Sequence, residues 1–205
     1  KGRKLLYSYI SWAINRLPMD LISFLKSKKL FTDEECITID AAFDRAVLSK
    51  GTVIQSVNRY AKRLLFIESG LFRIFYVDDG KDITHFFFDE NYFIAPINSI
   101  FYNKSELYEW ETLETSTVKI ILYEDFMALG EKYPRLIRIA LDFSIQMLDL
   151  FSKKLNLLQF QTAADRYSIF LDMYPNLTNR VSLGSVASFL GITQQTQSVI
   201  RSKKM

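Results

Sequence analysis

Residues 181–205 read VSLGSVASFLGITQQTQSVIRSKKM, and this stretch contains two short helical patterns separated by a glycine. Gly191 suits a tight turn, and the small Ala187 lets a second helix approach closely. Thr193 is a typical N-cap for that second helix. The first helix has the i, i+3, i+4, i+7 spacing of a buried face, formed by Leu183, Val186, Ala187 and Leu190. The stretch therefore predicts a helix-turn-helix.

The charge of this region is positive. From Asn176 onwards the sequence contains no Asp or Glu, and its charged residues are Arg180, Arg201, Lys203 and Lys204. A basic tract on a helix-turn-helix is the usual footprint of phosphate contact, so we expect these four residues to hold double-stranded DNA. The alternative is a solvated C-terminal helix without a ligand.

The outward face of the second helix is expected to carry amides and hydroxyls. At about 100° per residue, Gln197 and Ile200 point inward and Val199 lies at the edge of the outward face. Gln can bond adenine through two atoms, and Ser can contact bases or phosphate. The predicted base contacts come from Gln194, Gln195 and Ser198, and the remaining members of the expected DNA-binding surface are Thr193 and Thr196.

The middle of the chain, about residues 50–123, is rich in β-branched and aromatic residues. Its strand-like runs are TVIQSV, RLLFIES, LFRIFYV, ITHFFF and TVKIILY. Asp79-Gly80 lies between two of them and is a strong hairpin signal. Short, regularly spaced strands favour an antiparallel sandwich or jelly-roll barrel. The region before residue 48 is predicted to be helical, with a Thr32–Glu35 capping box.

Two further helices are predicted, one before and one after the strand-rich region. Residues 1–18 form a helical extension, because apolar residues with helical spacing are present at Leu6, Ile10, Ala13 and Leu17. A signal peptide is the less favoured interpretation, because polar residues interrupt the stretch and no cleavage pattern follows. A shorter helix is expected over about 163–174, before Pro175.

One long helix is predicted from Pro134 to about Phe160. One of its faces is expected to pack on the barrel, through Leu136, Ile139, Ala140, Phe143, Met147 and Leu150. A second apolar face follows a short heptad pattern, formed by Leu141, Ser144, Leu148, Phe151, Leu155 and Leu158. Two apolar faces on one helix indicate a core on one side and a second copy of the chain on the other, so we expect a homodimer. The alternative is that the heptad face also packs on the barrel.

The composition argues against an enzyme. The 205 residues carry a net charge of +3, one Cys and one His (Cys36 and His85), which cannot build a zinc site alone. No phosphate-binding glycine motif occurs, and no base is paired with a nucleophile. Glu109, Glu111 and Glu114 are expected on a solvated strand face and turn. A single thiol and the absence of a membrane-length apolar run favour the cytoplasm, with no membrane partner.

Three segments resemble the Crp/Fnr family of bacterial transcription regulators. They are IESGLFRIFYVDDGKDIT (67–84), AADRYSIFLDMYPNL (163–177) and VSLGSVASFLGIT (181–193). After the helical extension (1–18), the resemblance implies an α+β chain: a cyclic-nucleotide-binding-like β-roll of jelly-roll type (19–132), a long dimer helix (133–160) and a winged helix-turn-helix (161–205). The wing is expected to be short or absent. RNA polymerase is a further candidate partner.

The sequence departs from the family pattern in the expected effector pocket. Family members that bind cyclic AMP use a Gly-Glu pair and an Arg, but residues 89–114 contain no Gly and no Arg and carry mostly negative charge. We therefore expect no binding of cyclic AMP in the family manner, and no cofactor. The pocket either takes another ligand or is filled by its own side chains, and its candidate residues are Phe88, Tyr92, Ile97, Ser99, Tyr108 and Trp110.

A second departure lies in the recognition helix. Related sequences commonly read GITpETLSRIR, whereas this chain has Gln195 for the Glu and Val199 for the first Arg. The loss of that Arg removes the commonest guanine contact, so the expected outcome is either a DNA site less dependent on guanine at that position or weaker specificity overall. The competing hypothesis is a ligand- or partner-binding β-roll protein whose helix-turn-helix no longer reads DNA.

Overall fold

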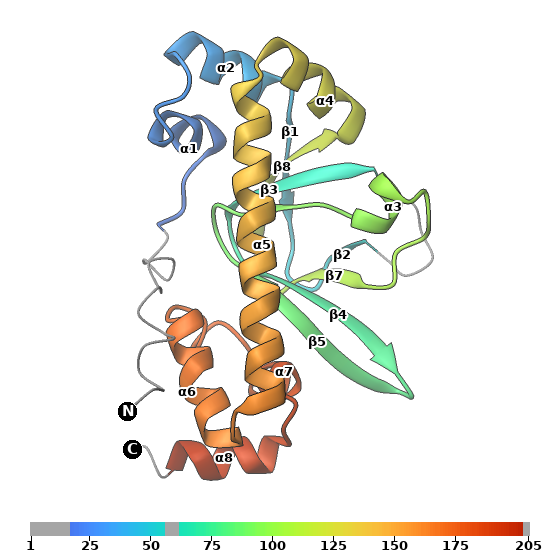
Figure 1. The fold of residues 1–205 in the computed structure, drawn as a ribbon, viewed down its shortest axis with the longest axis vertical. Helices are drawn as coiled ribbons and strands as arrows, with labels where there is room; N and C mark the ends of the chain where they lie inside the picture. The colour runs from blue at the N-terminus through green and yellow to red at the C-terminus, as the bar shows by residue number, and fades with distance from the viewer. Residues whose placement is uncertain (1–16, 56–61, 203–205) are drawn as a thin grey trace. The chain divides into compact units, whose positions relative to one another are not determined.

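The computed structural model describes residues 17–55 and 62–202, and in these ranges the chain forms eight helices and eight strands. It divides into two compact units, Leu17–Asp149 and residues 150–202. Helix α5 (Arg135–Phe160) is continuous and contributes residues to both units (Figure 1). The predicted helical extension lies outside the described residues, apart from Leu17 and Pro18, which are not helical.

The first unit is built on two antiparallel sheets of four strands. One sheet has the order β1 (Asp44–Leu48), β8 (Ser116–Leu122), β3 (Arg63–Ser69), β6 (Phe93–Ile94). The other has the order β2 (Val53–Gln55), β7 (Glu109–Thr112), β4 (Phe72–Asp78), β5 (Lys81–Phe88). Strands that are adjacent in a sheet are mostly distant in sequence, as in a jelly roll. The predicted α+β class with an antiparallel β-roll is confirmed.

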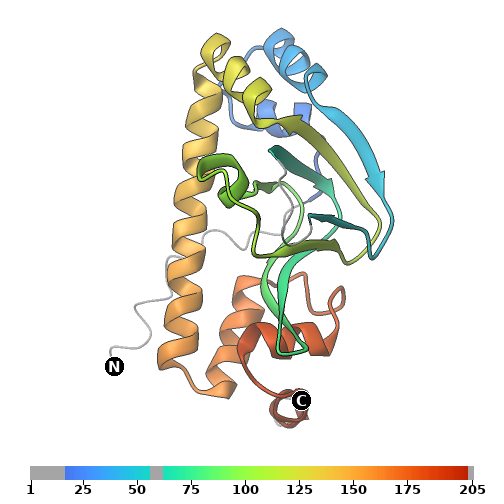
Figure 2. The ribbon, with the colours of Figure 1, turned by 90° about the vertical axis from the view of Figure 1, so that its right-hand side faces the viewer.

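Helices close one end of the β-roll. The helices α1 (Leu21–Ser27), α2 (Asp33–Ala41) and α4 (Tyr123–Lys132) lie near the start of α5 (Figure 2). Their apolar residues share a core with β3 and the first half of α5, in which Phe24 contacts Phe66 and Phe143. The predicted capping box is present, because Thr32 Oγ1 accepts the Glu35 N–H and Glu35 accepts the Thr32 N–H. Burial of this core stabilises the unit.

The hairpin between β4 and β5 forms where the sequence predicts it. Asp79 has φ 47° and Gly80 has φ 71°, and positive φ at both central residues matches a turn of type I′. Further along the hairpin, Ile74 pairs with Phe86 while Phe75 pairs with Thr84. His85 is therefore the extra residue of a β-bulge, and its ring stacks on Tyr108 with centroids 4.8 Å apart.

Some sequence predictions for this unit are wrong. Residues 44–48 were expected to be helical but form strand β1, because they pair along their whole length with β8. The short helix α3 (Ile97–Phe101) lies where no element was predicted, whereas β7 lies where Glu109 and Glu111 were expected on a strand face. The predicted long helix is correct to within one residue, since α5 begins at Arg135, directly after Pro134.

The second unit contains the last part of α5 and three further helices. These are α6 (Ala163–Met173), α7 (Leu183–Leu190) and α8 (Gln194–Ser202), and α6 packs against both α7 and α8. The centre of the unit is aromatic: the rings of Phe170, Tyr174 and Phe189 lie 5.4–5.8 Å apart. Residues 150–202 thus form a helical unit, and no strand is present in that range.

Candidate nucleic-acid interface

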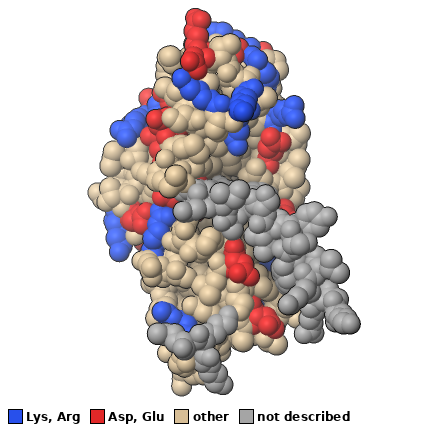
Figure 3. Space-filling view, turned by 90° about the vertical axis from the view of Figure 1, so that its left-hand side faces the viewer, with Lys and Arg blue, Asp and Glu red and all other residues tan. Residues whose placement is uncertain are grey.

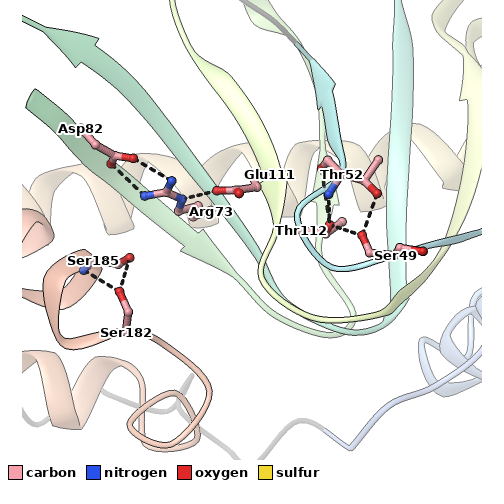
Figure 4. A network of polar contacts seen from close by, with 8 residues as sticks. All are labelled: Ser49, Thr52, Arg73, Asp82, Glu111, Thr112, Ser182 and Ser185. Atoms are coloured by element: carbon pink, nitrogen blue, oxygen red, sulfur yellow. Dashed lines mark hydrogen bonds and ion pairs between the residues drawn. The ribbon is translucent and has the colours of Figure 1, made fainter. Parts of the chain in front are cut away.

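Helices α7 and α8 form the predicted helix-turn-helix. Ser182 caps α7, because its Oγ accepts the Ser185 N–H at 3.0 Å, and the two hydroxyls pair at 2.8 Å (Figure 4). Gly191 ends α7 with φ 62° and ψ 39°, a left-handed conformation that glycine adopts without strain. The Ile192 N–H then donates to the Ala187 carbonyl at 3.0 Å, which fixes the turn.

The start of α8 is capped by Thr193. Its Oγ1 accepts the Thr196 N–H at 3.1 Å, and the hydroxyls of the two threonines pair at 2.8 Å. Both residues belong to the predicted DNA-binding set. The structure gives their hydroxyls a capping function at the end of the helix that would enter a groove.

The exposed face of α8 matches the predicted orientation. Gln197 is buried, with 1% of its surface exposed, and Ile200 is half-buried. Val199 is 49% exposed, so it belongs to the outward face rather than to its edge. The exposed residues of the helix are Gln194, Gln195, Ser198, Val199, Arg201 and Ser202. The inward and outward faces are therefore confirmed, whereas the contacts with bases remain a prediction.

The buried amide of Gln197 is incompletely bonded. Among the described residues, no hydrogen-bond partner is found for its Oε1. A buried polar atom without a partner costs about 1–3 kcal/mol. The inward-facing Gln therefore weakens the packing of α8, as the sequence suggested.

Gln194 lies against the first turn of α7. A Cβ atom built on Gly184 would lie 2.8 Å from Gln194 Nε2, and Gly184 has no unusual φ. The glycine leaves space for this side chain, and a larger residue would require the flexible end of Gln194 to move. Sequence reasoning did not single out Gly184, and its position in the first turn of a helix, where glycine is unfavourable, is the signal that indicated a close approach.

The predicted phosphate-binding residues are only partly within the described residues. Arg201 is exposed in the last turn of α8, and Arg180 is half-buried before α7. Lys203 and Lys204 lie outside the described residues. On the face that Figure 3 presents, Lys and Arg side chains are interspersed with Asp and Glu rather than gathered in one patch.

Arg166 of α6 holds the helix-turn-helix together. Its Nη1 donates to the Leu190 carbonyl at 3.0 Å, its Nη2 to the Leu158 carbonyl at 2.8 Å, and its Nε to the Gln161 carbonyl at 3.1 Å. These carbonyls lie at the ends of α5 and α7, where helices leave acceptors unpaired. Arg166 was quoted in the family motif AADRY, but no positioning function was predicted for it.

Lys154, on the last part of α5, is buried within the same helical unit. It is 7% exposed, and its Nζ lies 4.4 Å from the centroid of the Phe189 ring. Burial lowers the pKa of Lys154 to about 8. The ring partly replaces the water that the ammonium has lost.

Several residues of the predicted effector pocket are buried or half-buried aromatic side chains. Phe88 and Trp110 are buried, and the ring of Tyr92 packs edge-on against Phe88 with centroids 5.4 Å apart. Tyr108 is half-buried and stacks on His85. Ser99 is also buried, but Ile97 is 52% exposed on α3, so the structure does not bring Ile97 into this cluster.

Several acidic residues of 89–114 bond the protein itself. Glu90 accepts the Gly70 N–H at 3.1 Å, and Glu106 accepts the Ser99 N–H at 2.7 Å. Both carboxyl groups are buried. Each one satisfies a backbone donor that would otherwise lie unpaired in the β-roll.

Glu111 was expected on a solvated strand face, and it lies on strand β7 with its side chain 23% exposed. It accepts Arg73 Nε at 2.6 Å, while both terminal nitrogens of Arg73 bond Asp82 at 2.8 and 2.7 Å (Figure 4). The Arg73 side chain is 12% exposed. Burial alone would lower the pKa of Arg73, but its bonds to Asp82 and Glu111 outweigh burial and raise it. This ion-pair group joins β4, β5 and β7.

Helix α5 has one buried and one exposed apolar face. Leu136, Ile139 and Phe143 are buried. Of the predicted dimer residues, Leu158 is half-buried, and the exposed members are Leu141, Ser144, Leu148, Phe151 and Leu155. Ile137 and Ile145 add to the exposed apolar surface and were not predicted. An apolar surface along a single helix is typical of a protein contact.

No protein-family model and no curated protein matches this chain. Solved structures match it throughout most of its length. The c-di-GMP responsive global regulator CLP of Xanthomonas campestris is 17% identical, with 84% of this chain and 91% of that chain covered and a TM-score of 0.68. A CooA mutant of Carboxydothermus hydrogenoformans is 16% identical, with 91% and 84% covered and a TM-score of 0.70.

A Crp/Fnr-family regulator structure from Eubacterium rectale is 14% identical, with 88% and 87% covered and a TM-score of 0.67. Likeness at this level of identity shows the fold, so the chain has the fold of Crp/Fnr-type regulators. Among the described helices, none is long and apolar enough to span a bilayer. Within the same residues, no group of three potential metal-ligating side chains is present.

Proposed function

We propose that this chain is a DNA-binding transcription regulator of the Crp/Fnr type that acts as a cytoplasmic homodimer. The observation that carries the proposal is the exposed polar face of α8, which follows α7 through the left-handed turn at Gly191. The fold likeness supports the same class. In this account α8 enters the major groove of double-stranded DNA and α7 supports it.

The dimensions and charge of the second unit support groove binding. An α-helix such as α8 is about 10–12 Å in diameter with its side chains, so it can enter a major groove about 12 Å wide. Arg180 and Arg201 flank the helix-turn-helix and would neutralise phosphates, together with Lys203 and Lys204. Thr193 and Thr196 would fix the start of α8 near the bases.

The exposed apolar face of α5 supports the homodimer. In the proposed dimer, Leu141, Leu148 and Leu155 meet their counterparts on a second copy, with Ser144, Phe151 and Leu158 in the companion positions. A two-fold dimer presents two copies of α8 to two half-sites of DNA. Burial of leucines that are otherwise exposed would stabilise the association.

The β-roll is proposed to work without cyclic AMP bound in the family manner. Residues 89–114 offer no Arg to a cyclic phosphate, and Glu90 and Glu106 would repel it. A change in the β-roll would reach α8 through α5, and RNA polymerase is the further partner through which a bound regulator would act.

A second candidate function is a β-roll protein whose terminal helices no longer read DNA. The buried and incompletely bonded Gln197 favours it, because a loosely packed α8 would bind DNA weakly. The two candidates differ in a direct measurement. The full chain is titrated with genomic fragments and random competitor DNA at several salt concentrations.

The first function predicts preference for particular fragments and a steep loss of affinity with salt. Absence of binding to every fragment at low salt, by a folded dimer, would refute it. Val199→Arg provides a second readout at the same surface. Since Val199 is exposed, this variant should fold normally and should change either affinity or base preference if α8 docks as proposed.

A further inference from the structure

The exposed surface of the first two turns of α8 is uncharged. It presents two amides, a hydroxyl and a branched aliphatic side chain, on Gln194, Gln195, Ser198 and Val199. Arg or Lys is the usual reader of guanine, through the O6 and N7 atoms together. The first charged residue of the helix is Arg201, in its last turn. The part of α8 that would lie deepest in the groove therefore lacks a guanine reader.

The amide of Gln194 is restricted by its neighbour. Its Nε2 lies where a side chain at residue 184 would begin, and Gly184 leaves that space open. Gln195 is exposed beside it. The Gln195 amide is exposed and can bond a base through both its oxygen and its nitrogen. The edge of a base that matches an amide in this way is the N6 and N7 edge of adenine.

Val199 lies one helical turn after Gln195 on the same face. Residues four positions apart on a helix lie about 5–6 Å apart, which corresponds to between one and two base-pair steps of about 3.4 Å. Val199 has 49% of its surface exposed, with two methyl groups available for an apolar contact. In the major groove, the apolar group that a base offers is the C5 methyl of thymine.

We infer that α8 recognises adjacent adenine–thymine pairs, with Gln195 bonding adenine and Val199 packing on the methyl group of a thymine one or two base pairs away. The inference rests on the proposed function, because it names the DNA chemistry that the same surface takes. Ser198 lies between the two readers and contacts either a base or a phosphate. The recognised half-site is thus centred on A·T pairs rather than on guanine.

The test begins with selection of DNA ligands for the full chain from a random pool. Each thymine of the selected site is then replaced by uracil, which lacks the C5 methyl, and each adenine by 7-deazaadenine, which lacks N7. At one thymine, uracil should weaken binding about fourfold, the effect of losing one buried methyl group. At one adenine, 7-deazaadenine should weaken binding about fivefold or more.

Two variants link these effects to the named residues. With Val199→Ala, the uracil substitution should no longer matter, while the 7-deazaadenine effect stays. With Gln195→Glu, preference at the adenine position should change to cytosine, whose N4 donates to a carboxylate. Gln159→Ala serves as the matched control, because it removes an exposed amide on α5, outside α8, and should leave both effects in place.

The outcomes separate the inference from the function on which it rests. Selected sites that have guanine at these positions, or that are indifferent to uracil and 7-deazaadenine, overturn the inference while DNA recognition stands. The inference is also overturned if uracil still weakens binding by Val199→Ala, or if Gln195→Glu still prefers adenine and is weakened by 7-deazaadenine, since other residues would then read the bases. If the folded dimer selects no sequence, the proposed function and the inference fail together.

Discussion

The guanidinium of Arg166 donates to the carbonyl of Leu190, the last residue of α7, at 3.0 Å. The next residue is Gly191, whose left-handed conformation turns the chain into α8. Because Arg166 also bonds carbonyls at the end of α5, one side chain fixes both helix ends around the turn. The orientation of the proposed reading surface thus depends on a residue that makes no base contact.

Replacement of Arg166 by Met should destabilise the helical unit. Three carbonyls would lose a charged donor, so the free energy of unfolding should fall by about 2–4 kcal/mol. Urea denaturation followed by circular dichroism measures this change. Arg138→Met is the matched control, since Arg138 is exposed and its loss should change stability by less than about 0.5 kcal/mol. Equal stability of the two variants would contradict the proposed positioning function.

Replacement of Gln197 by Leu should stabilise α8. The substitution removes a buried oxygen for which the described residues offer no partner, and it supplies an apolar side chain of similar size. The expected gain in the free energy of unfolding is about 1–3 kcal/mol. Gln195→Leu, on the exposed face, should give no such gain. A loss of stability in Gln197→Leu would mean that the buried amide is satisfied in solution.

Lys154 should make the stability of the helical unit depend on pH. Its pKa is lowered from 10.5 to about 8 in the folded chain, so between these values the unfolded chain binds more protons. Stability should therefore rise as the pH increases from 8 to about 10. Lys154→Met should lack this rise and should be more stable at pH 7 by on the order of 2 kcal/mol.

Urea titrations of both proteins at pH 7 and pH 9.5 measure this difference. The quantity compared is the difference in the free energy of unfolding between the wild type and Lys154→Met. Other groups titrate alike in both proteins, so their contribution cancels in this difference. The gap should narrow at the higher pH. A gap that is equal at both values would show that Lys154 keeps an ordinary pKa in the folded protein.

Charge on the exposed face of α5 should disrupt the proposed dimer. Leu148 is 68% exposed, so Leu148→Glu is compatible with the folded chain but would bury two carboxylates at a two-fold interface. Sedimentation should show more monomer, with the dissociation constant of the dimer raised at least about tenfold. Val77→Glu places the same charge on another exposed apolar position, on β4, and should leave the dimer intact.

Much of the fold could be predicted from the sequence because its signals are local. The capping box at Thr32, the turn at Asp79-Gly80 and the glycine at 191 each determine the backbone within a few residues. The apolar spacing of α5 and α7 also identified most of their buried residues, but Leu183 was predicted to be buried on α7 and is 46% exposed, while Phe189 is buried there instead. In each case the physical cause lies within one helix or one hairpin.

The features that sequence reasoning missed arise from contacts between distant segments. Strand β1 is largely exposed, and it is a strand because it pairs with β8, about 70 residues further along the chain. Glu111 bonds Arg73 across two strands. The acceptors of Arg166 are backbone carbonyls, which carry no sequence signal. The burial of Lys154 likewise depends on an aromatic ring from another helix.

The central claim is that α8 and its flanking basic residues hold DNA. Its most direct test is the affinity of the full chain for a selected DNA site as a function of salt concentration. Phosphate contacts from Arg180, Arg201, Lys203 and Lys204 of both copies predict a slope of about −7 in a plot of log affinity against log salt. Binding that is specific for one sequence and has such a slope is the expected result. A folded dimer that binds no DNA at low salt would contradict the account.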